Sequence, residues 1–153
     1  MPQMVKGGKY TFGWSKVGDD GSMVIPPEAF VEYKFKHEQK VILISGSNKS
    51  GGFGLTYKKK LEGTALFQVL KNNPQLINFT MDDKTPVKIG TKYYAWTVIT
   101  DHYFTPGLDV LNCYGVKPGD KLLVVRGSGL ALGFLVRGPI VGFARDYPGL
   151  KIF

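Results

Sequence analysis

The chain has 153 residues, 43% of them hydrophobic, which suits a single compact domain with its own core. The formal net charge is +8, and no apolar run has the length of a membrane span. One Cys excludes an internal disulfide, and with only two His it makes a zinc site improbable on composition. We therefore expect a cytoplasmic protein with no metal, no cofactor and no membrane partner.

The first part of the chain predicts short strands separated by turns. Residues 10–17 alternate aromatic with small or polar side chains, as a half-buried strand does. Residues 18–21 read as a turn, and a short strand over 23–25 ends at two prolines. The other elements predicted here are a helix at 27–33, strands at 41–45 and 53–57, a helix at 64–72 and a closing strand at 76–79.

The second part of the chain predicts the same plan. Residues 92–100 are expected to form a strand, and the helical turn that follows begins near Pro106. Strands at 122–125 and 133–136, a helix at 138–147 and a closing strand at 150–153 complete the prediction.

An internal repeat explains why the two plans agree. The segment 33–55 reappears at 114–136 without a gap, with Tyr, two Lys, Gly-Ser and Gly-Phe in register. Trp14 and Trp96 recur upstream, and a Pro-x-Leu-x-x-Phe pattern ends at Phe79 and again at Phe153. We therefore predict repeat one at 10–79, a linker at 80–91 and repeat two at 92–153.

The repeat predicts a mainly β fold with short helices. A single copy would leave an exposed apolar sheet edge, whereas two copies can remove such edges by closing a barrel. The expected architecture is therefore a pseudo-twofold barrel in which each copy carries an added helix and a closing strand. A second chain could associate with it but is not required to close the barrel.

Each copy resembles the AbrB/SpoVT swapped-hairpin family. In the first copy the resemblance rests on Gly21, Ile25, Pro26 and Glu28, followed by the apolar strand at 40–44. The second copy lacks Ile-Pro but has the family's Gly-Asp turn at 118–120, where the first copy has Glu38-Gln39. Related cradle-loop barrels carry similar turns, so the barrel topology stays open.

The resemblance implies a non-enzymatic DNA-binding protein, with transcriptional regulation as one role of the family. The basic residues typical of the family's DNA face are missing, because Ser22, Phe30 and Val31 occupy positions where it often has cations. The remaining candidates for contacting double-stranded DNA are lysines, which would give non-specific and salt-sensitive affinity. They are Lys9, Lys16, Lys34, Lys36, Lys58, Lys59 and Lys60.

The alternative is a diverged barrel that has lost DNA binding and holds a small molecule or a protein partner. Charge is concentrated in residues 41–92, which have eight Lys and three acidic residues, or +5, but a solvated lysine surface would look the same. The glycine-rich segments at 46–52 and 127–133 join strand to strand, which favours hairpins over phosphate loops. Cys113, His102 and Asp101 lie on different predicted elements, so we expect no catalytic residues.

Overall fold

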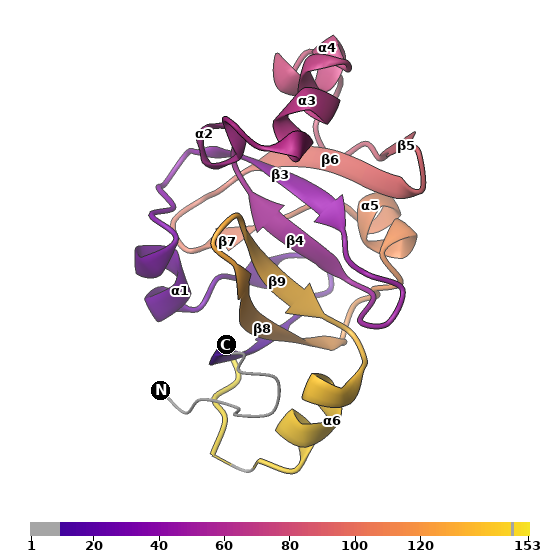
Figure 1. Ribbon diagram of the computed structural model, residues 1–153. Helices are drawn as coiled ribbons and strands as arrows, with labels where there is room; N and C mark the ends of the chain where they lie inside the picture. Colours follow the sequence, from indigo (N-terminus) through magenta and orange to yellow (C-terminus); the bar gives the residue numbers. More distant parts are fainter. Residues whose placement is uncertain (1–9, 148) are drawn as a thin grey trace.

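Antiparallel strand pairing organises the computed structural model, which describes residues 10–147 and 149–153 (Figure 1). The main sheet has seven strands, and a two-stranded ribbon packs against it. In their order across the main sheet, the strands are β1 (Tyr10–Lys16), β8 (Lys121–Ser128), β9 (Ala131–Leu135), β4 (Phe53–Thr56), β3 (Lys40–Ser45), β6 (Lys92–Val98) and β5 (Val87–Ile89). The ribbon pairs β2 (Met23–Val24) with β7 (Tyr103–Phe104).

The described residues also form six short helices. They are α1 (Pro27–Glu32), α2 (Lys58–Leu61), α3 (Ala65–Lys71), α4 (Pro74–Ile77), α5 (Leu108–Cys113) and α6 (Pro139–Arg145) in the described residues. Three of them, α1, α4 and α6, begin with a proline at the first or second position, where its missing N–H would have no helical partner.

Strands distant in sequence lie side by side in the sheet. The N-terminal strand β1 pairs with β8, where Trp14 faces Leu123, and β3 pairs with β6, where Ile42 faces Trp96. Strands β4 and β9 pair with each other at the centre through Gly54 and Gly133. The sheet is therefore assembled by exchange of strands between the early and late parts of the chain.

The main core lies on one face of this sheet. Phe53 of β4 and Phe134 of β9 stack at 4.9 Å between ring centroids and are almost completely buried. Phe104 from the ribbon packs edge-on against both rings, so the ribbon covers this face. Aromatic packing of this kind contributes beyond the burial of apolar area alone.

Two smaller clusters cover the opposite face at separate places. Helix α6 buries Val141 against Trp14 and Leu123. The helices α2, α3 and α4 cover Ile42 and its neighbours on β3 and β6. In Figure 1 these two sets of helices lie at opposite ends of the sheet, with β4 and β9 between them.

Two turns with the same hydrogen bonds precede β3 and β8. The Lys36 N–H donates to Oε1 of Gln39 at 3.1 Å, and the Lys117 N–H donates to Oδ2 of Asp120 at 3.0 Å. In each turn the last residue also donates its N–H back to the first, at 3.2 Å and 3.1 Å respectively. Gln39 and Asp120 therefore perform the same structural task, which requires a side-chain oxygen rather than a charge.

The third residue of each turn has a left-handed backbone. Glu38 has φ of 66° and Gly119 has φ of 90°. Glu38 donates its N–H to the Ile99 carbonyl at 2.7 Å, and Gly119 donates to the Val17 carbonyl at 2.9 Å. These bonds hold each turn against the end of a strand from the other part of the chain, which is β6 for the first turn and β1 for the second.

The prediction of a mainly β fold with short helices is confirmed, but several elements differ, among them α2, a helix that was not predicted. Residues 76–79 are not a strand, because α4 begins at Pro74 and the Asn78 N–H donates back to the Pro74 carbonyl. A strand, β5, lies within the segment predicted as a linker. The C-terminal residues 150–153 contribute an isolated bridge between Ile152 and Trp14 instead of a strand.

A closed barrel is not seen in the pairing of the described strands. Among the described strands, β1 pairs with β8 alone and β5 with β6 alone, so the seven-stranded ladder is open at both ends, and the C-terminal residues meet the other edge of β1 through the bridge between Trp14 and Ile152. The predicted hairpins at the two glycine-rich segments are confirmed, since β3 pairs with β4 and β8 with β9. Within the described residues, no helix has both the length and the apolar character needed to cross a bilayer.

Candidate nucleic-acid interface

Lysines at the start of β3 gather around a group of aromatic rings. The Lys60 Nζ lies 5.3 Å from the ring centroid of Tyr33 and 5.6 Å from that of Tyr57. The Tyr57 hydroxyl donates to the Tyr33 carbonyl at 2.8 Å, which brings α2 beside the segment that carries Lys34 and Lys36. Lysines 34 and 36 are exposed on either side of buried Phe35.

The same surface continues around Phe79 and Trp96. The Lys40 Nζ lies 5.2 Å from the centroid of Phe79 and 5.6 Å from that of Trp96. Lys58 lies 6.0 Å from the centroid of Phe79 and donates to the Ile77 carbonyl at 3.2 Å. Cation–π contacts of this kind hold an ammonium group in place while leaving it accessible to solvent.

We call this surface the lysine face, and it includes five of the seven lysines predicted as nucleic-acid contacts. Lys16 is not part of this face. It is exposed at the end of β1, where its backbone lies opposite Lys121 of β8. Lys9 lies outside the described residues. Lys40 was not predicted, because only the pairing of β3 with β6 brings it beside Trp96. The members of the lysine face are Lys34, Lys36, Lys40, Lys58, Lys59 and Lys60.

The charge of the lysine face is not neutralised by salt bridges. Within residues 10–147 and 149–153, the carboxylate contacts of basic side chains involve His37 and Arg126, and none involves a lysine. Burial raises the pKa of Tyr33 to about 12 and also raises the pKa of Tyr57, so both rings stay neutral at physiological pH. The lysine face therefore carries positive charge, and the tyrosine rings that Lys60 contacts are uncharged.

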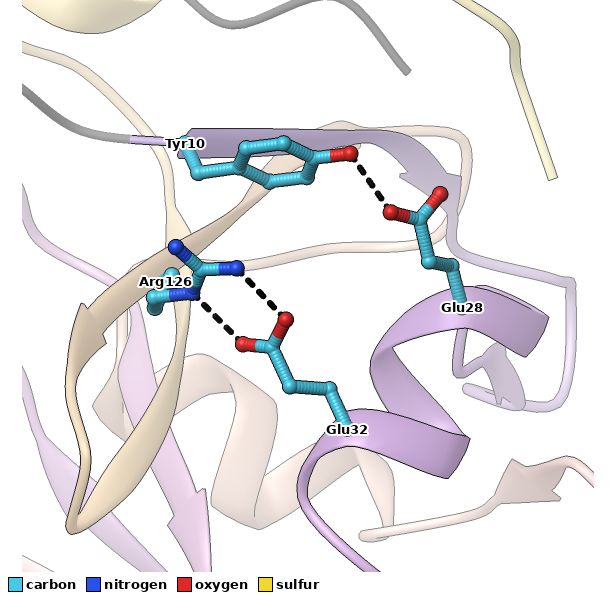
Figure 2. Close-up of polar contacts among 4 residues, drawn as sticks. All are labelled: Tyr10, Glu28, Glu32 and Arg126. Carbon is cyan, nitrogen blue, oxygen red and sulfur yellow. Dashed lines mark hydrogen bonds and ion pairs between the residues drawn. The ribbon is translucent and has the colours of Figure 1, made fainter.

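Helix α1 presents acidic side chains, in contrast to the lysine face. Glu32 accepts two hydrogen bonds from Arg126 of β8, at 2.6 Å from Nε and 2.5 Å from Nη2 (Figure 2). Tyr10 of β1 donates its hydroxyl to Glu28 at 2.5 Å, and the Arg126 guanidinium lies 4.7 Å from the Tyr10 ring centroid. This cluster joins β1, β8 and α1, so Arg126 has a structural partner.

The positions at which the AbrB/SpoVT family often carries cations have other tasks here. Ser22 donates its backbone N–H to Oδ1 of Asp20 at 2.9 Å in the turn before β2. Phe30 packs against the ring of His102 at 4.3 Å, and Val31 is exposed to 74%. None of these three side chains is a cation, so none of them can form an ion pair with a DNA phosphate.

The residues considered for catalysis are not assembled into a catalytic group. The Asp101 N–H donates to Nδ1 of His37 at 2.8 Å, whereas His102 contacts Phe30. Cys113 lines a different pocket beside Tyr114, and burial and then Asp109 raise the pKa of its thiol, which disfavours a nucleophilic thiolate. Within the described residues, no three His, Cys, Asp or Glu side chains lie in an arrangement that would hold a metal ion.

Comparison of the chain with protein-family models, curated protein sequences and solved structures finds no match.

Proposed function

We propose that this chain is a non-enzymatic nucleic-acid-binding protein that holds double-stranded DNA through the lysine face. The observation that carries the proposal is the set of lysines gathered at one end of β3, none of which is paired with a carboxylate of the described residues. Uncompensated ammonium groups attract phosphates, and binding is driven by release of the counterions condensed on DNA.

The side chains on this face favour contact with the backbone over reading of bases. A lysine acts as a point charge, whereas two-pronged recognition of guanine or phosphate uses the planar fork of arginine. The lysine face has no arginine among its members, and the Arg126 fork is engaged by Glu32. The proposed affinity is therefore only weakly dependent on sequence and strongly dependent on salt.

We also propose that the fold consists of two AbrB/SpoVT-like copies related by a pseudo-twofold axis that passes between β4 and β9. The strand order supports this, because β1-β8-β9 on one side of that point corresponds to β6-β3-β4 on the other. The two matching turns support it as well.

A pair of aromatic–cation contacts is further support for this repeat. Lys121 of β8 lies 5.6 Å from the Trp14 ring centroid, the distance that separates Lys40 of β3 from Trp96. Each lysine begins the third strand of its own copy and contacts the tryptophan of the other. In the proposed arrangement the two copies enclose one core and neither copy is an independent binding head.

A titration of labelled duplex DNA of mixed sequence, followed by fluorescence anisotropy at several salt concentrations, tests the proposed function. We expect log K to fall linearly with log salt concentration, because each neutralised phosphate contributes a slope of about −0.9. The triple variant Lys58→Gln/Lys59→Gln/Lys60→Gln should make this slope shallower by about 2–3 and weaken binding at low salt.

The matched control removes three cations from the other end of the β3–β4 hairpin. Lys92 donates to the Ser45 carbonyl at 3.2 Å and Arg137 to the Asn48 carbonyl at 2.9 Å, and exposed Lys49 follows Asn48 in the same loop. Lys49→Gln/Lys92→Gln/Arg137→Gln changes the net charge equally but should leave the slope nearer to that of the wild type. Equal losses in the two triple variants, or no binding at low salt, would refute the lysine face as the DNA site.

A further inference from the structure

A second surface, separate from the lysine face, has the features of a small-ligand pocket. An open pocket of about 590 Å³ lies between β1, the start of β8, the end of α6 and the C-terminal segment. Its walls include Trp14, Lys121, Arg145, Tyr147 and Leu150. A pocket of this volume is in the range that accommodates small organic molecules.

Trp14 brings an unused hydrogen-bond donor to this pocket. The side chain is only 7% exposed, and its indole N–H has no hydrogen-bond partner among residues 10–147 and 149–153. In that part of the chain, every completely buried side-chain nitrogen or oxygen has a partner, so the indole nitrogen of Trp14, which lines the pocket, is in contact with solvent. The equivalent donor of Trp96 is satisfied by the Met81 carbonyl at 3.0 Å, and Phe79 covers that ring at 5.1 Å.

The charges around the indole favour an anion. Lys121 and Arg145 both line the pocket, and neither forms an ion pair within the described residues. The one carboxylate in the lining belongs to Asp120, and its Oδ2 already accepts the Lys117 N–H at 3.0 Å. The lining therefore carries two cations and one carboxylate, a net charge of +1, beside the rings of Trp14 and Tyr147 and several aliphatic side chains.

We propose that this pocket binds a small organic anion, in which an aromatic body carries a phosphate or a carboxylate. The anionic group is held by Lys121 and Arg145, and the indole N–H of Trp14 donates to an acceptor on the ligand. The apolar part packs against Tyr147 and Leu150. A buried donor and charge-assisted hydrogen bonds together give orientation as well as affinity.

The two tryptophans provide a direct test by ¹H–¹⁵N NMR, since each gives one indole cross-peak. Trp14→Phe and Trp96→Phe assign the peaks independently, so assignment succeeds even if one variant does not fold. The probes are adenosine monophosphate as an aromatic phosphate, indole-3-acetate as an aromatic carboxylate, and adenosine as an uncharged control. We expect at least one anion to shift the Trp14 peak saturably while the Trp96 peak stays fixed, and adenosine to bind about tenfold more weakly or worse.

Charge removal then identifies the groups that hold the anion. Arg145→Gln and Lys121→Gln should each raise Kd about tenfold, whereas Lys40→Gln, which removes the equivalent cation beside Trp96, should leave Kd unchanged. The proposal is overturned if neither anion moves the Trp14 peak, if adenosine binds as well as its phosphate, or if Lys40→Gln weakens binding as much as Arg145→Gln. These results are independent of duplex DNA binding by the lysine face, because the variants that test that face leave Lys121 and Arg145 in place.

Discussion

Arg126 shows how one side chain can connect three elements at the surface. It makes a two-pronged bond with Glu32 of α1 and lies over the Tyr10 ring of β1, while its own backbone belongs to β8 (Figure 2). The hydrogen bonds from Arg126 hold the pKa of Glu32 below its ordinary value. Since the folded state favours the ionised carboxylate, this contact stabilises the protein above the unfolded-state pKa and is lost as pH falls through the folded-state pKa.

Replacement of Glu32 by Gln should therefore have an effect that depends on pH. At pH 7 we expect Glu32→Gln to lower Tm by about 2 °C, a modest value because both side chains are partly exposed. The difference from wild type should shrink as the pH falls below 4.5, the ordinary pKa, because wild-type Glu32 is then progressively protonated. Thermal melts from pH 7 to pH 3 measure this.

The control for this prediction is Glu62→Gln, which alters an exposed carboxylate at the end of α2 that makes no ion pair within the described residues. It should leave Tm unchanged at every pH. A deficit of Glu32→Gln that persists at pH 3 would mean that the side chain acts through packing and not through its charge.

Individual residues also show which parts of the lysine face and of the Trp14 pocket could be predicted from the sequence. Lys34, Lys36 and Lys58 to Lys60 were predicted from charge and position in the sequence, and in the structure all but half-buried Lys60 are exposed. Lys40 and Phe79 were missed, since their meeting at 5.2 Å depends on α4 folding back over β6. The pocket at Trp14 was missed for the same reason, because its walls come from both ends of the chain.

At the scale of elements, local patterns were the reliable guide. The pattern at 10–17 and the apolar run at 41–45 correspond to β1 and β3, although β1 is buried on both faces and not half-buried as predicted, and the prolines mark where α1 and α6 begin. The predicted strand at 76–79 was wrong, because a short apolar run around Leu76 is compatible with either a strand or a helix. Pro74 favours the helix, since proline is well suited to a first helical turn. Pairing partners depend on tertiary packing, which no window of sequence contains.

The two turns before β3 and β8 lead to a pair of predictions, in which one substitution stabilises the fold and the other destabilises it. Glu38 adopts φ of 66°, a conformation that costs a residue with a side chain about 1 kcal/mol, so Glu38→Gly should stabilise the fold by up to about 1 kcal/mol. Gly119 has φ of 90° and open space around an added Cβ, so Gly119→Ala should destabilise through the backbone alone, by about 1 kcal/mol.

Urea denaturation measured for both turn variants checks this pair. Unchanged m-values would show that the variants alter stability and leave the compactness of either state as it was. If Glu38→Gly destabilises the protein, the Glu38 side chain contributes an interaction that outweighs its strained backbone.

At the scale of the whole molecule, the fold depends on the exchange of β1 and β6 between the two parts of the sheet. Among the described strands, β1 pairs with β8 alone, and β3 is flanked by β4 and β6, so each part of the chain completes the sheet of the other. A fragment that ends near residue 79 keeps β3 and β4 but loses the partner of β1.

We therefore expect fragments 1–79 and 80–153 to be unfolded when each is prepared alone. Circular dichroism should show no cooperative thermal transition for either fragment, and an equimolar mixture should regain the β-sheet signal because the missing partners are then present. A cooperative transition in one isolated fragment would show that it completes its own sheet, and would contradict the proposed interdependence of the copies.

The pairing of Trp14 with Leu123 has a further consequence during synthesis. A ribosome produces β1 long before β8, so the first strand leaves the exit tunnel with no partner for its backbone hydrogen bonds. Contacts between residues so distant in sequence also slow folding, because the intervening chain must first be ordered. The nascent chain therefore carries an unpaired, aromatic-rich strand until β8 has been synthesised.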